Sequence, residues 1–142
     1  MRKNKIALFL VFLIFVAGNL FSKELISTET RSGNGKPDRW IYLKADGGYI
    51  IEADNNYDGK IDYRLETDEM GRKVFEEMDF EFTGRMNNFY YYVNGVLARH
   101  EIDSNNDGNI DIWIYLEEGI YIVRIERDTD HDGTIDFVRS YK

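Results

Sequence analysis

A nine-residue pattern of oxygen-bearing side chains occurs three times along this chain, at residues 54–62, 103–111 and 128–136. Each copy reads D-x-[N/D]-x-D-G-x-I-D, so carboxylates and amides recur at alternate positions before a glycine. A hard cation such as Ca²⁺ takes roughly six to eight oxygen ligands, which a short loop supplies when alternate side chains point inward. We therefore predict calcium sites in these three acidic loops. The candidate ligands are Asp54, Asn56, Asp58, Lys60 and Asp62; Asp103, Asn105, Asp107, Asn109 and Asp111; and Asp128, Asp130, Asp132, Thr134 and Asp136.

The seventh residue of each acidic loop would contribute its backbone carbonyl, and the sixth is a glycine where such a loop turns sharply. The pattern resembles the EF-hand and dockerin calcium loops, and more closely the strand-flanked D-x-[D/N]-x-D-G-x-x-D loops of FG-GAP-type and related exported bacterial repeats. It departs from the EF-hand at the twelfth position, where Leu65, Ile114 and Arg139 replace the bidentate glutamate. The helix-loop-helix geometry is therefore not expected, and the last aspartate would act as the bidentate ligand.

Two weaker copies of the pattern complete a regular array. These degenerate loops lie at residues 30–38 and 79–87, and with one and two carboxylates we expect them to be plain turns. The glycines at the sixth position of the five loops are 24 or 25 residues apart, which predicts five copies of one structural unit. Asp-Gly and Asn-Gly also form turns without a metal, so plain turns remain the alternative for the acidic loops too. The oxygen-bearing residues of the degenerate loops are Thr30, Ser32, Asn34 and Asp38, and Asp79, Glu81, Thr83 and Asn87.

Paired short strands are predicted between the loops. Residues 111–116 and 120–126 are rich in β-forming residues and flank a short turn, and Asn94-Gly95 is a strong hairpin signal. All connections are too short for crossovers, so neighbouring strands must be antiparallel. We expect an all-β, up-and-down meander of about ten short strands, built from five units of 24–25 residues. A sheet of that size is expected to be curled or closed into a small barrel.

Alternation along the predicted strands gives two different faces. One face collects aliphatic residues such as Ile41, Ile112 and Ile114, whereas the other collects aromatic side chains. This aromatic face is either a surface that binds a protein or a glycan, or the packing of rings against charged neighbours such as Arg64 and Glu66. Its candidate ligand-binding residues are Trp40, Tyr42, Phe89, Tyr91, Trp113 and Tyr115.

The N-terminal segment is typical of an export signal. Basic residues at positions 2, 3 and 5 precede an apolar run at residues 6–17, which is too short to span a bilayer as a helix. We interpret residues 1–22 as a signal peptide and residues 23–142 as one β-repeat domain. An uncleaved N-terminal anchor, and with it contact with the membrane, is the alternative. Export to the periplasm, the cell surface or the medium follows, and a chain without cysteine has no disulfide there.

Charge and composition argue against several functions. The chain carries 26 acidic and 18 basic side chains, a formal net charge of −8, which argues against binding to a nucleic-acid backbone. Its two histidines, His100 and His131, are expected to be solvated surface residues. With no recognisable catalytic motif, we expect no enzymatic activity.

Together these features predict an exported bacterial protein that binds calcium in its repeat loops and acts as a binding module at the cell envelope or surface. The alternative is a purely structural envelope protein whose acidic loops are turns without a specific ligand.

Overall fold

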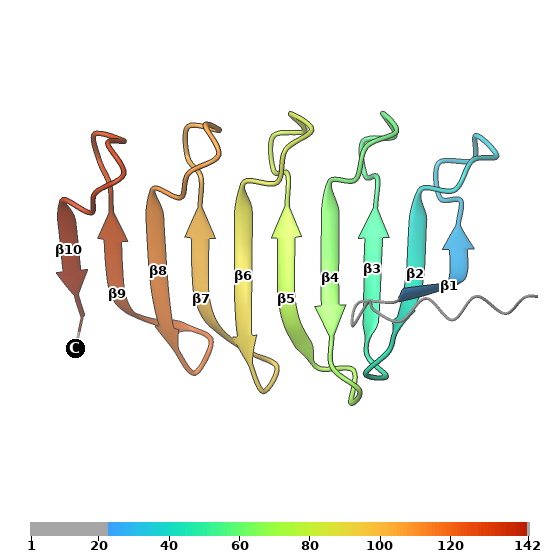
Figure 1. Cartoon of the computed structure of the whole chain (residues 1–142), viewed down its shortest axis with the longest axis horizontal. Coiled ribbons are helices and arrows are strands. Elements are labelled where there is room, and N and C mark those ends of the chain that lie inside the picture. Colours follow the sequence, from blue (N-terminus) through green and yellow to red (C-terminus); the bar gives the residue numbers. More distant parts are fainter. Residues whose placement is uncertain (1–22, 142) are drawn as a thin grey trace, which may run out of the picture.

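The computed structural model describes residues 23–141, which form one ten-stranded antiparallel sheet (Figure 1). Each strand pairs with its neighbours in the sequence, which confirms the predicted all-β meander. None of the described residues forms a helix that could cross a membrane. The signal peptide predicted at residues 1–22 lies outside the described residues. The strands are β1 (Lys23–Glu29), β2 (Arg39–Lys44), β3 (Tyr49–Ala53), β4 (Tyr63–Thr67), β5 (Lys73–Met78), β6 (Asn88–Val93), β7 (Val96–Ile102), β8 (Ile112–Glu117), β9 (Tyr121–Arg127) and β10 (Phe137–Ser140).

Two kinds of connection alternate along the sheet. The acidic and degenerate loops lie at one end of the strands, called here the loop end, where each leads from an odd-numbered strand to the next even-numbered strand. Tight turns close the hairpins β2–β3, β4–β5, β6–β7 and β8–β9 at the opposite end, the turn end (Figure 1). The meander therefore brings all five loops to the same side of the molecule.

One row of side chains crosses all ten strands. Its members lie 24 or 25 residues apart on alternate strands, so the sheet gains no stagger from one repeat to the next. A barrel closes only when its strands are staggered around the barrel axis. The sheet is accordingly open, with β1 and β10 as its edges, and the expectation of a small barrel is wrong. The row consists of Thr28, Trp40, Glu52, Arg64, Glu77, Phe89, Glu101, Trp113, Glu126 and Val138.

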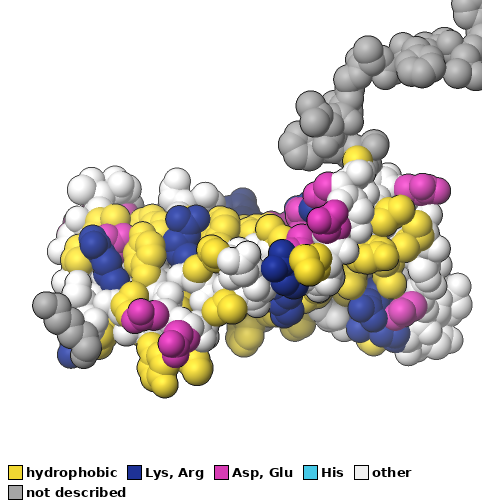
Figure 2. Space-filling view, turned by 90° about the horizontal axis from the view of Figure 1, so that it is seen from below, with side chains coloured by type: hydrophobic (Ala, Val, Ile, Leu, Met, Phe, Trp, Pro, Cys, Tyr) yellow, Lys and Arg dark blue, Asp and Glu magenta, His cyan; other side chains and the backbone are white. Residues whose placement is uncertain are grey.

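The sheet is a single layer with little enclosed core. Among the described residues, Ile50 and Ala53 are the apolar side chains that are fully buried. Most other strand residues are half-buried between their cross-strand neighbours. Figure 2, seen from the turn end, shows apolar side chains interspersed with Lys and Arg along the molecule. Cross-strand contacts and the bonds within the loops, rather than a second layer, must therefore stabilise the sheet.

Candidate metal centre

All five loops share one backbone turn. The sixth residue, always glycine, has a positive φ, a left-handed conformation in which a side chain would be strained. The fourth residue also has a positive φ, although only one of the five is a glycine. The degenerate loops thus make the same turn as the acidic loops, so the turn does not depend on the number of carboxylates. The fourth residues are Gly33, Tyr57, Phe82, Asn106 and His131.

The first aspartate of a loop holds this turn closed. The carboxylate of Asp103 accepts hydrogen bonds from the N–H groups of Asp107 (3.2 Å) and Gly108 (2.8 Å). It is buried, so the bonds replace those that water would make. This predicted ligand therefore stabilises the loop without a cation. The same two contacts are made in their own loops by the buried carboxylates of Asp54, Asp79 and Asp128.

The last side chain of a loop bonds back to the start of the loop. Asp62 accepts from the N–H groups of Asn55 (2.7 Å) and Asn56 (3.1 Å). Asp111 accepts from the N–H of Ser104 (2.7 Å). The degenerate loops make equivalent contacts through Asp38 and Asn87, so an amide oxygen serves this purpose as well as a carboxylate.

The middle positions of the acidic loops form a second set of local bonds. In loop 103–111, Asn105 accepts from the N–H of Asp107 (2.9 Å) and donates its amide to that carboxylate (3.0 Å). The N–H of Asn109 donates to Asp107 (2.8 Å), and this bond lowers the pKa of Asp107. Asn109, predicted to bind calcium through its carbonyl, is thus held in the loop by its backbone N–H. Loop 54–62 repeats the arrangement with Asn56, Asp58 and Lys60, and loop 128–136 repeats its last bond with Asp132 and Thr134.

One acidic loop brings three carboxylates together. Oxygens of Asp128, Asp130 and Asp136 lie within 4.8 Å of one another, the one such group among the described residues. Loop 128–136 differs from the other two at its third position, where Asp130 replaces an asparagine. The negative charge of Asp132 raises the pKa of Asp130, whereas a hydrogen bond from Thr129 lowers the pKa of Asp136. The loop therefore gathers like charges that a bound cation would stabilise.

Loop 54–62 contains an unsatisfied carboxylate oxygen. Asp62 is 1% exposed, and its Oδ1 atom has no hydrogen-bond partner among residues 23–141, although Oδ2 accepts two N–H groups. A buried carboxylate oxygen without a partner is costly, and a cation or a water molecule would remove that cost. In loop 103–111 the equivalent oxygen of Asp111 is already in contact with His131. The two loops thus differ in their capacity for a further ligand.

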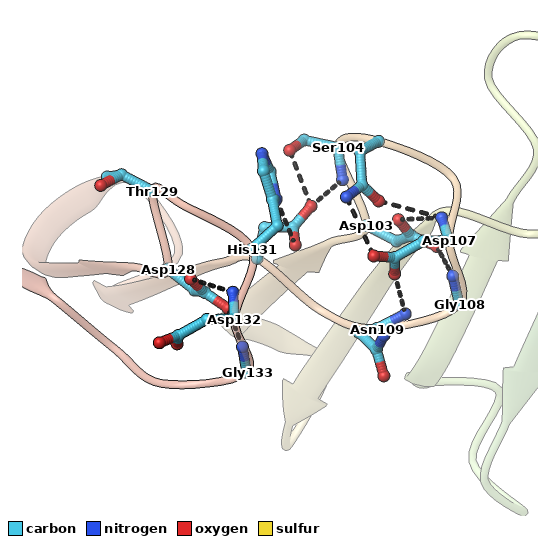
Figure 3. A network of polar contacts seen from close by, with 12 residues as sticks. Asp103, Ser104, Asp107, Gly108, Asn109, Asp128, Thr129, His131, Asp132 and Gly133 are labelled. Carbon is cyan, nitrogen blue, oxygen red and sulfur yellow. Dashed lines mark hydrogen bonds and ion pairs between the residues drawn. The ribbon is translucent and has the colours of Figure 1, made fainter.

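His131 links two neighbouring loops. Its Nδ1 lies 3.0 Å from Oδ1 of Asp111, so the ring of loop 128–136 reaches across to loop 103–111 (Figure 3). This contact raises the pKa of His131. Burial alone would raise the pKa of Asp111, but the hydrogen bonds from His131 and Ser104 lower it. Spacing within one loop gave no signal for a contact between two loops.

The histidines are therefore not simply solvated. His131 is exposed, as expected, but is paired with a carboxylate. The expectation is wrong for His100, which is half-buried, stacks on Tyr90 with 4.1 Å between ring centroids and lies 3.0 Å from Oδ1 of Asn88. Burial lowers the pKa of His100.

Basic and amide side chains extend these links along the loop end. Arg31 donates to the Asn55 side chain of the next loop (3.2 Å). Arg85 donates to the backbone carbonyl of Asn106 (2.8 Å), and the Asn106 amide donates to Glu81 (3.3 Å). Two of the three residues that reach across these gaps thus come from the degenerate loops. These loops contribute to the array by bridging their neighbours.

The six aromatic candidates share one face, as predicted, but do not touch as a continuous platform. The strand β7, which carries Arg99 and Glu101 on this face, separates the aromatic pairs of β6 and β8. Arg99 lies over the ring of Tyr91 at 4.3 Å, and the hydroxyl of Tyr115 donates to Glu126 (3.0 Å). These contacts support packing of Tyr91 and Tyr115 against charged neighbours. The six residues are half-buried: Trp40, Tyr42, Phe89, Tyr91, Trp113 and Tyr115.

No family model, no curated protein and no solved structure matches this chain. The function must therefore be inferred from the loops and faces of the chain itself.

Proposed function

We propose that this chain is an exported calcium-binding β-repeat protein that acts as a binding module at the cell envelope or surface. The observation that carries the proposal is the convergence of Asp128, Asp130 and Asp136 within 4.8 Å of one another. These carboxylates are held on a turn that hydrogen bonds already close. Loop 128–136 is thus prepared for a cation without needing one in order to fold.

The donor set favours calcium over other metals. Carboxylate, amide and carbonyl oxygens are hard ligands that suit Ca²⁺ and Mg²⁺, and the chain has no cysteine for a softer metal. The one histidine of the loop, His131, turns its Nδ1 to Asp111. An exposed loop of nine residues tolerates the irregular shell of Ca²⁺ better than the strict octahedron of Mg²⁺.

Loop 54–62 is the second proposed site. The unpartnered Oδ1 of Asp62 supports it, because a bound cation would satisfy that oxygen at little cost to the existing bonds. Loop 103–111 ranks third, since its last carboxylate already contacts His131 and Ser104. Binding of a protein or glycan partner is proposed for the aromatic face of the sheet, where half-buried rings alternate with charged side chains.

A structural envelope protein without a bound metal is the second candidate. It is favoured by one observation: all five loops make the same turn, and both degenerate loops close it with their own side-chain bonds. Under this alternative the acidic loops would be turns of the same kind.

A calorimetric calcium titration of the purified protein separates the two candidates. We expect weak binding, with dissociation constants on the order of 10⁻⁴ to 10⁻³ M, because the twelfth-position glutamate of the EF-hand is missing. The variant Asp136→Asn should lose one site, whereas the matched control Glu81→Gln in degenerate loop 79–87 should bind as the unmodified protein does. Absence of calcium-dependent heat at millimolar calcium would favour the metal-free alternative.

A further inference from the structure

The two edge strands are the separated halves of one hairpin. In every complete repeat an even-numbered strand follows a loop and the next odd-numbered strand returns to the following loop. At the C-terminal edge β10 follows loop 128–136, but within the described residues no returning strand pairs with it. At the N-terminal edge β1 leads into loop 30–38 with no described strand before it. Each edge therefore presents the half that the other edge needs.

We propose that β10 of one copy of this chain pairs with β1 of a second copy, so that the sheet continues from molecule to molecule. The even number of strands makes this possible by simple translation. Because neighbours are antiparallel throughout, β10 and β1 run in opposite directions, and a translated copy continues the alternation without inversion. Such a head-to-tail contact is heterologous, so it does not stop at two chains.

The repeat period fixes the register of this contact. In the hairpin β8–β9, Trp113 lies opposite Glu126. Val138 occupies in the last repeat the position that Trp113 has in the repeat before it. Thr28 occupies in the first repeat the position that Glu126 has in a later one, 24 residues before the equivalent Glu52. Val138 should therefore lie opposite Thr28 of the second copy. These two residues are the ends of the row that crosses the sheet, so the row would continue across the junction.

The backbone groups on both edges agree with this register. The N–H of Tyr141 donates to the carbonyl of Val123 in β9 (2.9 Å), so alternation turns the N–H and C=O of Val138 toward the open edge. On the other edge, the carbonyl of Glu29 accepts from the N–H of Asp38 (2.9 Å), which turns the same groups of Thr28 outward. A pair with both residues facing outward can exchange two hydrogen bonds.

Side chains at the two edges are also complementary. Val138 is 53% exposed, and in β1 the apolar Leu25 is 51% exposed, so both edges leave apolar surface in water. The single charge of β10 is Arg139, which in this register lies on the same face as Glu29 of the second copy, two residues away along the strand. Unpaired edges of this kind favour the addition of another strand.

Sedimentation velocity of the purified full chain in chelator tests the proposal independently of calcium. We expect the mass to rise with concentration beyond two chains. Val138→Pro and Thr28→Pro each remove one outward N–H without removing an N–H bond to the neighbouring strand, so each variant alone should be monomeric. An equimolar mixture of the two retains one intact edge on each variant, and it should form pairs and nothing larger. The controls Val138→Thr and Thr28→Val keep the N–H and should assemble as the unmodified chain does.

Each other result overturns the head-to-tail pairing. An unmodified chain that stays monomeric at all concentrations would contradict it. So would association of Thr28→Pro chains with one another through β10, or of Val138→Pro chains with one another through β1. If either proline variant loses its β-sheet spectrum, the variants Arg139→Glu and Glu29→Arg are used in place of the two proline variants. Each should lose association alone and regain it when the two are mixed, and a mixture that stays monomeric would contradict the pairing.

Discussion

Asp79 in loop 79–87 and Asp128 in loop 128–136 accept hydrogen bonds from the same two backbone positions of their loops. The two loops also share positive φ angles at their fourth and sixth residues. They differ in the other oxygens, because the acidic loop adds Asp130 and Asp136 where the degenerate loop has Glu81 and Asn87. The comparison separates two roles of the acidic residues. In these two loops the first aspartate closes the turn, whereas the third and last residues of loop 128–136 gather the charge.

The largest expected difference between the two loops is their response to calcium. At free calcium about 100 times the dissociation constant, one occupied site should stabilise the fold by roughly 2.7 kcal/mol. Asp136→Asn should lose this share of the calcium effect, and Thr83→Ala in loop 79–87 should retain the full effect. Urea unfolding with calcium, magnesium and chelator measures it, and magnesium should stabilise less. Equal calcium effects in both variants would remove the distinction between the loops.

The next effect should be similar in a degenerate loop, 79–87, and an acidic loop, 103–111. Asp79→Ala leaves three N–H groups of its turn without their buried acceptor and Asp103→Ala leaves two, at a cost of about 2 kcal/mol in each case. The exposed Asp107→Ala is the control and should lose less. Unfolding in chelator checks all three. A loss confined to Asp103→Ala would mean that the first aspartate closes the turn only in the acidic loops.

A smaller effect is expected at the glycine of the sixth position. Gly35 and Gly133 have φ angles of +80° and +89°, and a Cβ at either would meet no atom within 4 Å. Replacement of either by alanine should therefore cost backbone strain alone, about 1 kcal/mol. Thermal unfolding of the two variants in chelator should give matching losses. A much larger loss in Gly133→Ala would show that the acidic loop has a requirement that the degenerate loop lacks.

The smallest effect concerns pH and the bridge between loops. Asp111 raises the folded-state pKa of His131 above its unfolded value of about 6.5, so the bridge contributes stability below that pH. The contribution is lost as the pH rises through the raised pKa. His131→Gln should flatten this part of the stability curve measured in chelator. An unchanged slope in the variant would show that the contact is not maintained in solution.

Much of the fold could be predicted because its signals are local. Asn94-Gly95 and the short connections are sufficient to predict antiparallel neighbours, and the glycine spacing predicts the repeats. The open sheet was harder to predict, since closure depends on stagger that accumulates over ten strands. The row that ends at Thr28 and Val138 shows that this stagger is absent, but the row can be identified only once the strand pairing is known.

The site could be predicted in part. The spacing identified the loops that carry acidic residues, but it treated every aspartate as a ligand. Asp54, Asp103 and Asp128 also accept backbone N–H groups, a role that depends on how the turn folds and that the spacing did not indicate. The contact of His131 with Asp111 joins two repeats, so the pattern of one repeat held no information about it.

A crystal structure determined with calcium, using anomalous scattering to locate the ion, tests the central claim most directly. We predict an anomalous peak between the carboxylates of Asp128, Asp130 and Asp136, and none in degenerate loop 79–87. An empty loop 128–136 at saturating calcium, or a peak of equal height in loop 79–87, would contradict the account.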